Sequence, residues 1–186
     1  MFSKQILPGV ELKLIEDRHA PAMYSAISAD REYLREWLPW VDSTRSTDDT
    51  RDFIEKSLRQ FAKNEGFHAG IWVDDEYAGT IGCQAINWLN RKVEFGYWLG
   101  SRYTGRGVMT AAVSAMCDHA FEEWNLNRVQ LQCAAGNVRS QAIPRRLGFT
   151  EEGVIQQGQL LYGQFHDLIV FGMLRRVWER NRKSTR

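Results

Sequence analysis

The sequence has 186 residues, of which 44% are hydrophobic and 25% are charged, and this balance excludes a disordered or a fibrous chain. The formal net charge of +1 excludes a protein that gathers nucleic acid or an anionic membrane through its overall field. The length suits one domain over residues 1–186 that buries its own core without disulfides or a metal.

The N-terminal part of the sequence predicts a strand followed by three helices. Residues 10–15 alternate between apolar and polar side chains, as a half-buried strand does. Apolar residues then recur at helical spacing over 23–38, and Asp30 interrupts them as a cap between two short helices that end before Pro39. Acidic cap candidates at the start of 47–66 predict a third helix.

The central part of the sequence predicts an antiparallel meander and then a long helix. Three apolar runs, 67–73, 77–88 and 92–99, are separated by short polar turns. Small and apolar residues recur at helical spacing over 108–124, directly after the Gly-Arg-Gly segment that ends at residue 107. A strand, a glycine loop and a helix therefore follow one another.

The C-terminal part of the sequence completes a mixed α/β sheet. Residues 129–133 alternate as a strand, and 140–147 read as a short helix that Gly148 closes. Two closing strands are expected at 149–155 and 162–173. The order of elements predicts an α/β fold with helices on both faces of the sheet.

A basic C-terminal tail begins at about residue 175. The last twelve residues contain Glu179 and six basic residues, namely Arg175, Arg176, Arg180, Arg182, Lys183 and Arg186. Such a tail can contact ribosomal RNA, and it is also typical of a solvated, partly frayed terminus. Ribosome association is therefore one of two interpretations.

The cysteines and the N-terminus indicate a cytoplasmic protein. Cys83, Cys117 and Cys133 lie far apart in apolar surroundings, which suits reduced thiols and gives no metal-ligand spacing. The first residues lack the apolar stretch of a signal peptide, and the sequence has no apolar run of about eighteen residues that could span a membrane. We expect neither a metal nor a membrane partner.

Residues 102–107, with the sequence Arg-Tyr-Thr-Gly-Arg-Gly, lie where a strand is followed by a helix. Unpaired amides of such a loop and the positive end of the helix dipole favour an anion. Gly105 and Gly107 remove the Cβ atoms that would keep a phosphate away from the backbone, and Arg102 and Arg106 can add charged contacts. A tight turn that needs glycine for its dihedral angles is the alternative.

The residues after this loop exclude two common phosphate motifs. A P-loop requires Lys and then Ser or Thr after the second glycine, whereas Val108 and Met109 follow here. A dinucleotide fingerprint needs a third glycine in a first βαβ unit, and this loop follows a meander instead. A nucleoside triphosphate and a dinucleotide are therefore not expected.

Several segments together resemble the GNAT superfamily of acetyltransferases, and within it the ribosomal-protein N-terminal acetyltransferase (RimJ/RimL-like) branch. The segments that carry the resemblance are Phe95–Leu99, Tyr103–Thr110, Asn137–Ser140, Leu147–Gly153 and, in the N-terminal helical region, Trp37–Trp40. The resemblance spans nearly the whole chain. It implies the GNAT acyl-CoA N-acyltransferase fold, a mixed, mostly antiparallel seven-stranded sheet with helices on both faces and a splay between strands 4 and 5.

The resemblance implies acetyl-CoA as co-substrate, with its pyrophosphate on loop 102–107 and its pantetheine arm along 97–99. Asn137 would contact the pantetheine arm, or else serve as a turn residue. The residues expected to bind acetyl-CoA are Tyr97, Trp98, Leu99, Arg102, Tyr103, Thr104, Gly105, Arg106, Gly107, Val108, Met109 and Asn137.

Direct transfer of acetyl to an amine needs a base for the amine and a proton for the leaving thiolate. Glu94 is the candidate base, acting through a water, and its alternative role is to pair with an Arg or Lys on a neighbouring strand. Ser140 is the candidate donor to the sulfur, and its alternative role is a helix N-cap. A backbone amide near Tyr97 or Trp98 would polarise the thioester. Cys133, which alternates with apolar residues, is expected to be a core thiol.

The acceptor side is less defined by the sequence. Trp37 and Trp40 could form an apolar wall for a peptide N-terminus or a packing clasp, and the resemblance suggests that Asp167 shapes the acceptor site. The expected acceptor is the N-terminal amine of a ribosomal or other protein. A small amine as acceptor, a non-catalytic acetyl-CoA sensor and an RNA-binding protein are the alternatives, and assembly into a homo-oligomer is left open.

Overall fold

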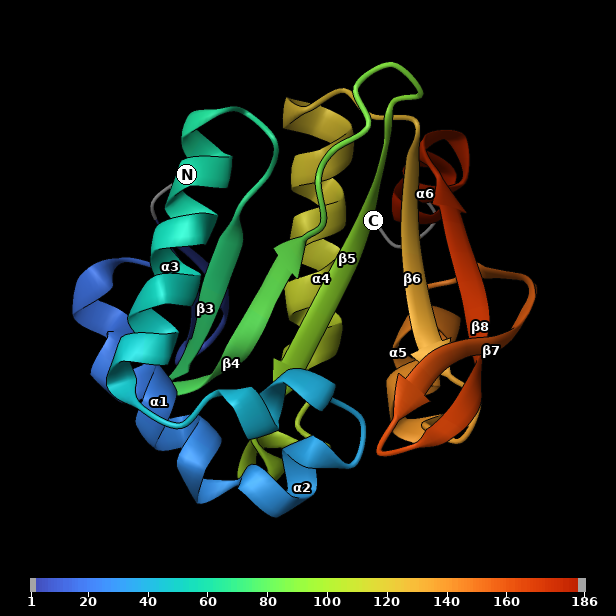
Figure 1. Cartoon of the computed structure of the whole chain (residues 1–186). Helices are drawn as coiled ribbons and strands as arrows, with labels where there is room; N and C mark the ends of the chain where they lie inside the picture. The colour runs from blue at the N-terminus through green and yellow to red at the C-terminus, as the bar shows by residue number, and fades with distance from the viewer. Residues whose placement is uncertain (1–2, 184–186) are drawn as a thin grey trace. The chain divides into compact units, whose positions relative to one another are not determined.

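The computed structural model describes residues 3–183 and divides them into two compact units. The first unit contains the described residues up to Cys83 together with Tyr97–Ala112, and the second contains Gln84–Gly96 and the described residues from Val113 onward. Strand β5 (Lys92–Leu99) and helix α4 (Val108–Asp118) each contribute residues to both units. Figure 1 labels helices and strands where there is room and colours the chain from its N-terminus to its C-terminus.

Four strands form the antiparallel sheet of the first unit. They are β1 (Ser3–Leu7), β2 (Val10–Leu14), β3 (His68–Val73) and β4 (Glu76–Cys83), paired in that order. Strand β2 buries every second side chain, as the alternation predicts, and its Leu12 lies opposite Ile71 of β3. The period of two thus decides which face of β2 enters the core.

Three helices pack against this sheet. They are α1 (Ala20–Ala29), α2 (Arg31–Arg35) and α3 (Thr47–Ala62), accompanied by the short 3-10 turns η1 (Asp17–His19), η2 (Pro39–Ser43) and η3 (Ser101–Tyr103). Helix α1 contacts both α3 and β4 (Figure 1), and Met23, Ile27 and Ile54 are buried where these helices meet the core. These apolar residues explain why marginal helices of this length are stable here.

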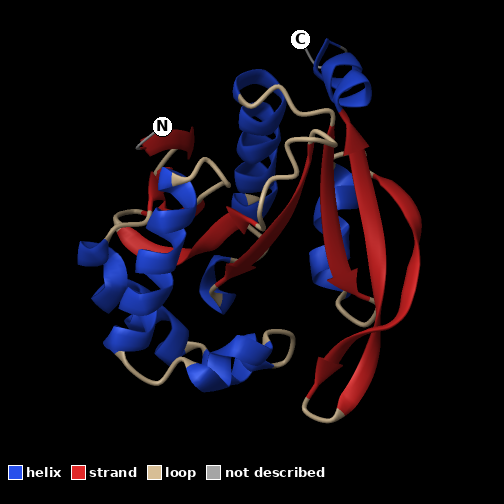
Figure 2. Ribbon diagram, turned by 45° about the horizontal axis from the view of Figure 1, so that its top comes forward, coloured by secondary structure: helices blue, strands red, loops and turns tan. Residues whose placement is uncertain are grey.

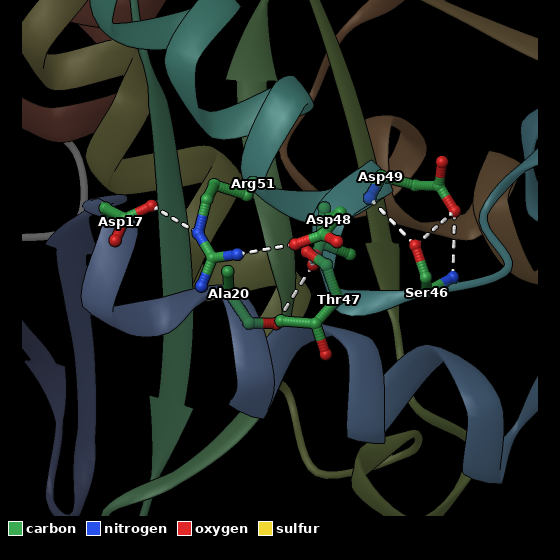
Figure 3. A network of polar contacts seen from close by, with 8 residues as sticks. Asp17, Ala20, Ser46, Thr47, Asp48, Asp49 and Arg51 are labelled. Carbon is green, nitrogen blue, oxygen red and sulfur yellow. Dashed lines mark hydrogen bonds and ion pairs between the residues drawn. The ribbon is translucent and has the colours of Figure 1, made fainter.

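The start of α3 is fixed by local polar contacts, which Figure 3 shows. Ser46 is the N-cap, and its side chain and that of Asp49 form a reciprocal capping box. Arg51 bonds Asp17 at 2.8 Å and Asp48 at 2.6 Å. The predicted helix is confirmed, but its N-cap is Ser46 rather than one of the candidates within 47–50. The exposed ion pairs add at most about 1 kcal/mol each.

The second unit contains four strands, of which one neighbouring pair is parallel. Its strands are the first part of β5, then β6 (Arg128–Ala134), β8 (Gln164–Leu174) and β7 (Thr150–Leu161), in that spatial order. Its helices are α5 (Val138–Arg146), α6 (Arg175–Lys183) and the π-helical turn His119–Glu123, which follows α4. Figure 2 shows β7 and β8 as a long twisted hairpin.

The predicted mixed, mostly antiparallel α/β fold is confirmed, but the predicted number of seven strands is wrong. The described residues form eight strands, because Ser3–Leu7 pairs with β2. None of the residues of this strand is fully buried, and its sequence lacks the alternation of apolar and polar residues that identifies a strand. With β1 counted, the predicted strands 4 and 5 are β5 and β6, whose parallel pairs end at Phe95 with Leu131.

Several element boundaries differ from the prediction, for example those of β4, α2 and β7. Strand β4 ends at Cys83 rather than near residue 88, because the chain then turns and Asn87 pairs with Lys92. Helix α2 ends at Arg35, before the predicted end. Strand β7 continues through the polar stretch after Ile155, since β8 supplies a pairing partner that the local sequence cannot reveal.

The C-terminal tail is a packed helix, so the prediction of a frayed, solvated end is wrong for 175–183. Trp178 of α6 is buried, and its indole nitrogen donates to Asp118 at 2.9 Å. Arg182 forms ion pairs with the same carboxylate and with Glu122. Arg186 of the predicted tail lies outside the described residues.

Candidate active site

The glycine loop lies in the first unit and adopts the backbone conformation that favours glycine. Gly105 and Gly107 have φ angles of +74° and +76°. A Cβ built on either residue would meet no atom within 4 Å. Glycine is therefore needed at both positions for the positive φ angle and not to make room for a packed neighbour, and the space beside the two residues is open.

Helix α4 begins directly after this loop and presents its first amides there. The N–H groups of Val108 and Met109 belong to the first turn, where no intrahelical acceptor exists. The side chains of both residues are buried, which anchors the first turn in the core. Ala111 donates to the carbonyl of Gly107 at 3.0 Å, so the helical bonding starts at the loop itself. This arrangement suits a bound phosphate.

The two arginines of the loop have different surroundings. Arg102 forms an ion pair with Glu76, donates to the Tyr103 hydroxyl and lies over the Tyr103 ring at 4.6 Å from its centroid. Tyr103 in turn donates to Glu76 at 3.0 Å. Arg106 is exposed and has no ion pair or hydrogen bond with the described residues. Arg106 is therefore the better candidate for a phosphate contact, because its charge is not already balanced.

The base of the loop is tied to the helical region by Asp30. Its carboxylate accepts from the backbone N–H of Ser101 at 2.6 Å and from the Ser101 hydroxyl at 2.8 Å. Asp30 does lie between α1 and α2, but its side chain makes no capping bond there. The predicted position is confirmed, whereas the side chain has a long-range role that sequence reasoning missed.

The end of β5, where the pantetheine arm is expected, lies close to the backbone of β4 in the first unit. Gly79 of β4 lies so close that an added Cβ would be 2.3 Å from the Trp98 carbonyl oxygen. Gly100, just after the strand, donates to Ala78 at 2.8 Å. Trp98 is buried, whereas Tyr97 and Leu99 are half-buried. Binding of pantetheine by 97–99 stays a prediction.

The two tryptophans expected on the acceptor side lie on a well-fixed segment of the first unit. Trp40 is half-buried with its ring 6.1 Å from that of Trp98, and Trp37 is also half-buried. Arg31 donates to the carbonyls of Val41 at 2.5 Å and Thr44 at 2.6 Å. A second arginine holds the same turn through two bonds to one carboxylate, Arg35 with Asp42.

Glu94, the candidate base, lies in the second unit and is half-buried. Its Oε2 accepts from the side-chain amides of Gln130 and Gln132, both at 2.9 Å. Burial raises the pKa of Glu94, and the two amide donors act against this shift. Its hydrogen-bond partners are amides, so the alternative of a surface ion pair with Arg or Lys does not describe this carboxylate. Sequence reasoning missed both glutamines.

Ser140, the candidate proton donor, lies near the start of α5 in the same unit. Asn137 is the N-cap of this helix, and its side chain accepts from the Ser140 amide at 3.0 Å. The alternative that Ser140 is the N-cap is therefore wrong. The Ser140 hydroxyl lies 3.2 Å from the sulfur of Cys133, which is buried as expected of a core thiol.

Asp167, expected near the acceptor, is an exposed residue of β8 with a structural contact. Its carboxylate accepts from the backbone N–H of Gln157 at 2.8 Å, where β7 bulges and Gln157 has a φ angle of +51°. A role at the acceptor site stays a prediction.

The candidate residues thus fall into two groups, one in each unit. The first unit holds the glycine loop, its anchor Asp30 and the tryptophans, and the second holds Glu94 with its glutamines and Ser140 with Asn137. Among residues 3–183, no cluster of three or more His, Cys, Asp and Glu side chains could hold a metal ion. The described part of the chain also contains no helix that is both long and apolar enough to cross a membrane.

Comparison with protein families gives a match to the acetyltransferase (GNAT) domain over residues 10–150. The chain is similar to the Bacillus subtilis (strain 168) protein named "Putative ribosomal N-acetyltransferase YdaF", with 35% identity over 96% of this chain and 98% of that protein. It is also similar to the ribosomal-protein-serine acetyltransferase of Escherichia coli (strain K12), with 25% identity over 91% of this chain and 95% of that enzyme.

A solved structure has the same fold. It is RimL, described as a ribosomal L7/L12 alpha-N-protein acetyltransferase in complex with coenzyme A, the coenzyme being held in a disulfide with a cysteine. The TM-score is 0.88 at 25% identity, and the match covers 91% of this chain and 96% of that one.

Proposed function

The chain belongs to the acetyltransferase (GNAT) domain family, and we propose that it transfers acetyl from acetyl-CoA to the N-terminal amine of a ribosomal or other protein. The observation that carries the proposal is the glycine loop. Two glycines in the left-handed conformation lead into the first turn of α4, with open space beside both of them. This is the arrangement that accepts a phosphate group on backbone amides.

In the proposed complex, the pyrophosphate lies on the amides that follow Gly105, and Arg106 pairs with its charge. The fit is supported by the unbalanced charge of Arg106 and by the anchoring of Val108 and Met109 in the core. The thioester arm would pair with the backbone of 97–99. The coenzyme A complex of RimL supports this choice of co-substrate.

The proposed reaction is direct attack of the amine on the thioester. The amine nitrogen forms a bond to the carbonyl carbon, the carbon–sulfur bond breaks, and coenzyme A leaves as a thiolate. Glu94 takes the proton of the amine through a water, and the Ser140 hydroxyl donates a proton to the sulfur. Solvent then reprotonates the Ser140 oxygen and takes the proton from Glu94, so both residues return to their starting state. A backbone amide near Tyr97 or Trp98 stabilises the oxyanion.

The acceptor is proposed from the relatives and from one surface feature. Two relatives that align over more than nine tenths of the chain are named for the acetylation of ribosomal proteins. The half-buried Trp37 and Trp40 lie on a turn that Arg31 and Arg35 hold in place. Such a fixed apolar surface suits a peptide N-terminus better than a small, highly charged amine.

The acceptor test uses labelled acetyl-CoA and two sets of amines. We expect turnover of peptides that copy ribosomal-protein N-termini, read as a mass increase on the α-amine, and no turnover of polyamines, aminoglycosides or free amino acids. Labelling of a cell lysate then identifies the protein acceptor. Turnover of the free amines alone would replace the proposed acceptor with a small molecule.

A variant of Glu94 tests whether the chain is a catalyst or a sensor. Glu94→Gln keeps the shape of the side chain but removes the base, so we expect acetyl-CoA binding to persist and turnover to fall by about 10²–10⁴-fold. Calorimetry and a thiol-release assay measure the two quantities. A wild type that binds acetyl-CoA but acetylates no amine would support the sensor instead.

A further inference from the structure

The face of β6 next to Glu94 carries a continuous row of polar side chains. Strands β5 and β6 are parallel, and Glu94 lies opposite Gln130 in the register. The residues of β6 that alternate with the buried Val129 and Leu131 therefore share the face of Glu94. This row consists of Arg128, Gln130 and Gln132.

Both glutamines bind the same oxygen of Glu94. Each amide nitrogen donates to Oε2 at 2.9 Å, whereas Oε1 accepts no hydrogen bond from the described residues. Two donors on one oxygen fix the rotation of the carboxylate and direct the lone pairs of the other oxygen away from β6. A carboxylate held in this way is oriented without being blocked.

The orientation of one of these amides is itself fixed. Arg128 donates to Oε1 of Gln130 at 3.0 Å, so the Gln130 nitrogen must face Glu94, because a flipped amide would set two donors against each other. Arg128 in turn donates to both carboxylate oxygens of Glu152 of β7 through its two terminal guanidinium nitrogens. A polar chain thus runs from Glu152 through Arg128 and Gln130 to Glu94.

The backbone beside this chain leaves room for it. Gly172 of β8 lies opposite Gln130, and a Cβ there would be 2.3 Å from a Glu152 oxygen and 2.5 Å from an Arg128 nitrogen. Any larger residue would displace the ion pair. The Arg128–Glu152 pair therefore depends on glycine at this position.

From this geometry we infer that Gln130 and Gln132 are positioning residues of the acetyl transfer, and that Arg128 and Glu152 set the orientation of Gln130. The inference rests on the proposed function, because it takes Glu94 as the base. The amides hold one oxygen of Glu94 so that the other receives the proton of the incoming amine. They act through Glu94 and need not touch substrate.

The charges around Glu94 agree with this role. Burial favours the neutral acid and raises the pKa of Glu94, while the two amides and the weaker field of Lys92 on the same strand favour the carboxylate. On the neighbouring strands, the charge of Arg128 is balanced by Glu152. The two amide dipoles therefore favour the Glu94 carboxylate more strongly than the cation of Lys92 does.

The test compares Gln130→Leu and Gln132→Leu with wild type in the pH dependence of kcat/KM. Each variant loses one donor that lowers the pKa of Glu94, so we expect the acidic limb to move upward by about 0.5–1 pH unit. We also expect kcat at neutral pH to fall about 3–30-fold with KM for acetyl-CoA unchanged. Gln164→Leu, an exposed residue of β8, is the matched control, for which neither quantity changes.

A titration of Glu94 in the free protein provides a readout that does not need activity. With ¹³C-labelled glutamate, the Glu94 carboxylate is expected to titrate at a higher pH in both variants, and Gln130→Glu, whose carboxylate repels that of Glu94, should raise it further. Unchanged titration and an unmoved acidic limb in folded variants would overturn the inference. If Glu94→Gln itself keeps the acidic limb, the proposed base is wrong, and this outcome is distinct from the first.

Discussion

Gly107 and Gly163 have nearly the same backbone conformation but different surroundings. Their φ angles are +76° and +80°, and a Cβ on either would meet nothing within 4 Å. Gly107 lies at the start of α4, whereas Gly163 lies in the turn between β7 and β8. Alanine substitutions at the two positions should cause similar backbone strain, but only the one at Gly107 should affect a ligand bound at the start of α4.

Both Gly107→Ala and Gly163→Ala are expected to lose about 1–2 kcal/mol of unfolding free energy, the cost of a Cβ in this conformation. Only Gly107→Ala should also weaken acetyl-CoA binding, by tenfold or more, because its methyl group enters the space proposed for the pyrophosphate. Urea unfolding and calorimetry measure the two effects. Equal affinities in both variants would contradict the placement of the phosphate.

His68 makes stability depend on pH. Burial lowers the pKa of His68 to about 4, and its Nδ1 lies 3.0 Å from the hydroxyl of the buried Ser57. In the unfolded chain, His68 has its ordinary pKa of about 6.5 and binds a proton more readily than in the folded chain. The free energy of unfolding therefore falls as pH decreases from about 6.5 to about 4, and His68 does not change it above pH of about 6.5.

The contribution of His68 is measured as a difference between variants. Between pH 7 and pH 5, wild type is expected to lose about 2 kcal/mol more unfolding free energy than His68→Gln, which has no group to titrate there. Urea unfolding of both proteins at the two pH values gives this difference, in which shared effects of Glu94 and His19 cancel. The same pH dependence in both proteins would show that His68 is accessible to protons when folded.

The catalytic candidates could be predicted from the sequence more readily than their surroundings. The glycine loop and Glu94 stand out only through the family resemblance, because a tight turn and a surface ion pair are ordinary explanations for the residues taken alone. Gln130 and Gln132 could not be found, because an alternating polar residue on a strand is usually only solvated, and their role depends on the β5–β6 register. Ser140 was open to two interpretations until Asn137 proved to be the cap.

At the scale of elements, Asp30 joins the helical region to the glycine loop. Its carboxylate binds the backbone and the hydroxyl of Ser101, which begins the turn η3 before the loop. The residue that follows it, Arg31, binds the carbonyls of the tryptophan-bearing turn. One helix junction therefore holds both a proposed cofactor segment and a proposed acceptor segment.

Asp30→Ala is expected to lower the unfolding free energy by about 1–2 kcal/mol and to weaken acetyl-CoA binding several-fold, since the loop loses its anchor. Ser101→Ala removes only the hydroxyl bond and should have about half the effect on stability. Chemical unfolding and calorimetry give both values. An Asp30→Ala variant with full affinity would show that the loop needs no anchor.

Helix α6 is held by burial as well as by charge. Trp178→Ala is expected to lower the unfolding free energy by about 3–5 kcal/mol, because it empties a buried aromatic site and leaves Asp118 with one donor fewer. The matched control, Arg176→Ala, changes an exposed side chain and should stay within about 0.5 kcal/mol of wild type. Thermal and urea unfolding compare them, and equal stabilities would mean that α6 is only loosely attached.

Elements can be predicted where the hydrophobic residues have a clear local period. They cannot be predicted where a segment becomes a strand only by pairing with a neighbouring strand. Strand β2 and helix α3 follow their patterns, whereas β1 and the polar middle of β7 become strands only because β2 and β8 lie beside them. The charge of the tail predicts a solvated end, whereas the buried side chain of Trp178 packs the helix against the core.

At the scale of the whole molecule, acetyl-CoA is expected to stabilise the folded chain. A ligand that binds only the native state at about 100 times its Kd adds about 2.7 kcal/mol. For a chain of this length, that corresponds to a rise in Tm of about 5–10 °C. Differential scanning fluorimetry with and without acetyl-CoA measures the shift, and Gly107→Ala should show less of it. No shift in wild type would contradict the proposed co-substrate.

The overall architecture was the most predictable property, because the order of elements and the balance of apolar residues restrict a chain of this size to few folds. The number of basic residues in the tail is a poor guide to its unpaired charge, since Arg175 forms an ion pair with Glu179 and Arg182 with Asp118. Association with the ribosome and with a second copy of the chain stay predictions.

The bulge that Asp167 holds in β7 has a consequence for solubility. Strand β7 is the last in its sheet, twelve residues long and exposed over nearly its whole length. A straight outer strand of that length would offer a regular ladder of free amides and carbonyls to a neighbouring molecule. The irregularities near Gly153 and Gln157 break that ladder into short pieces. A residue first considered for its place near the substrate thereby helps to protect the protein from intermolecular strand pairing and aggregation.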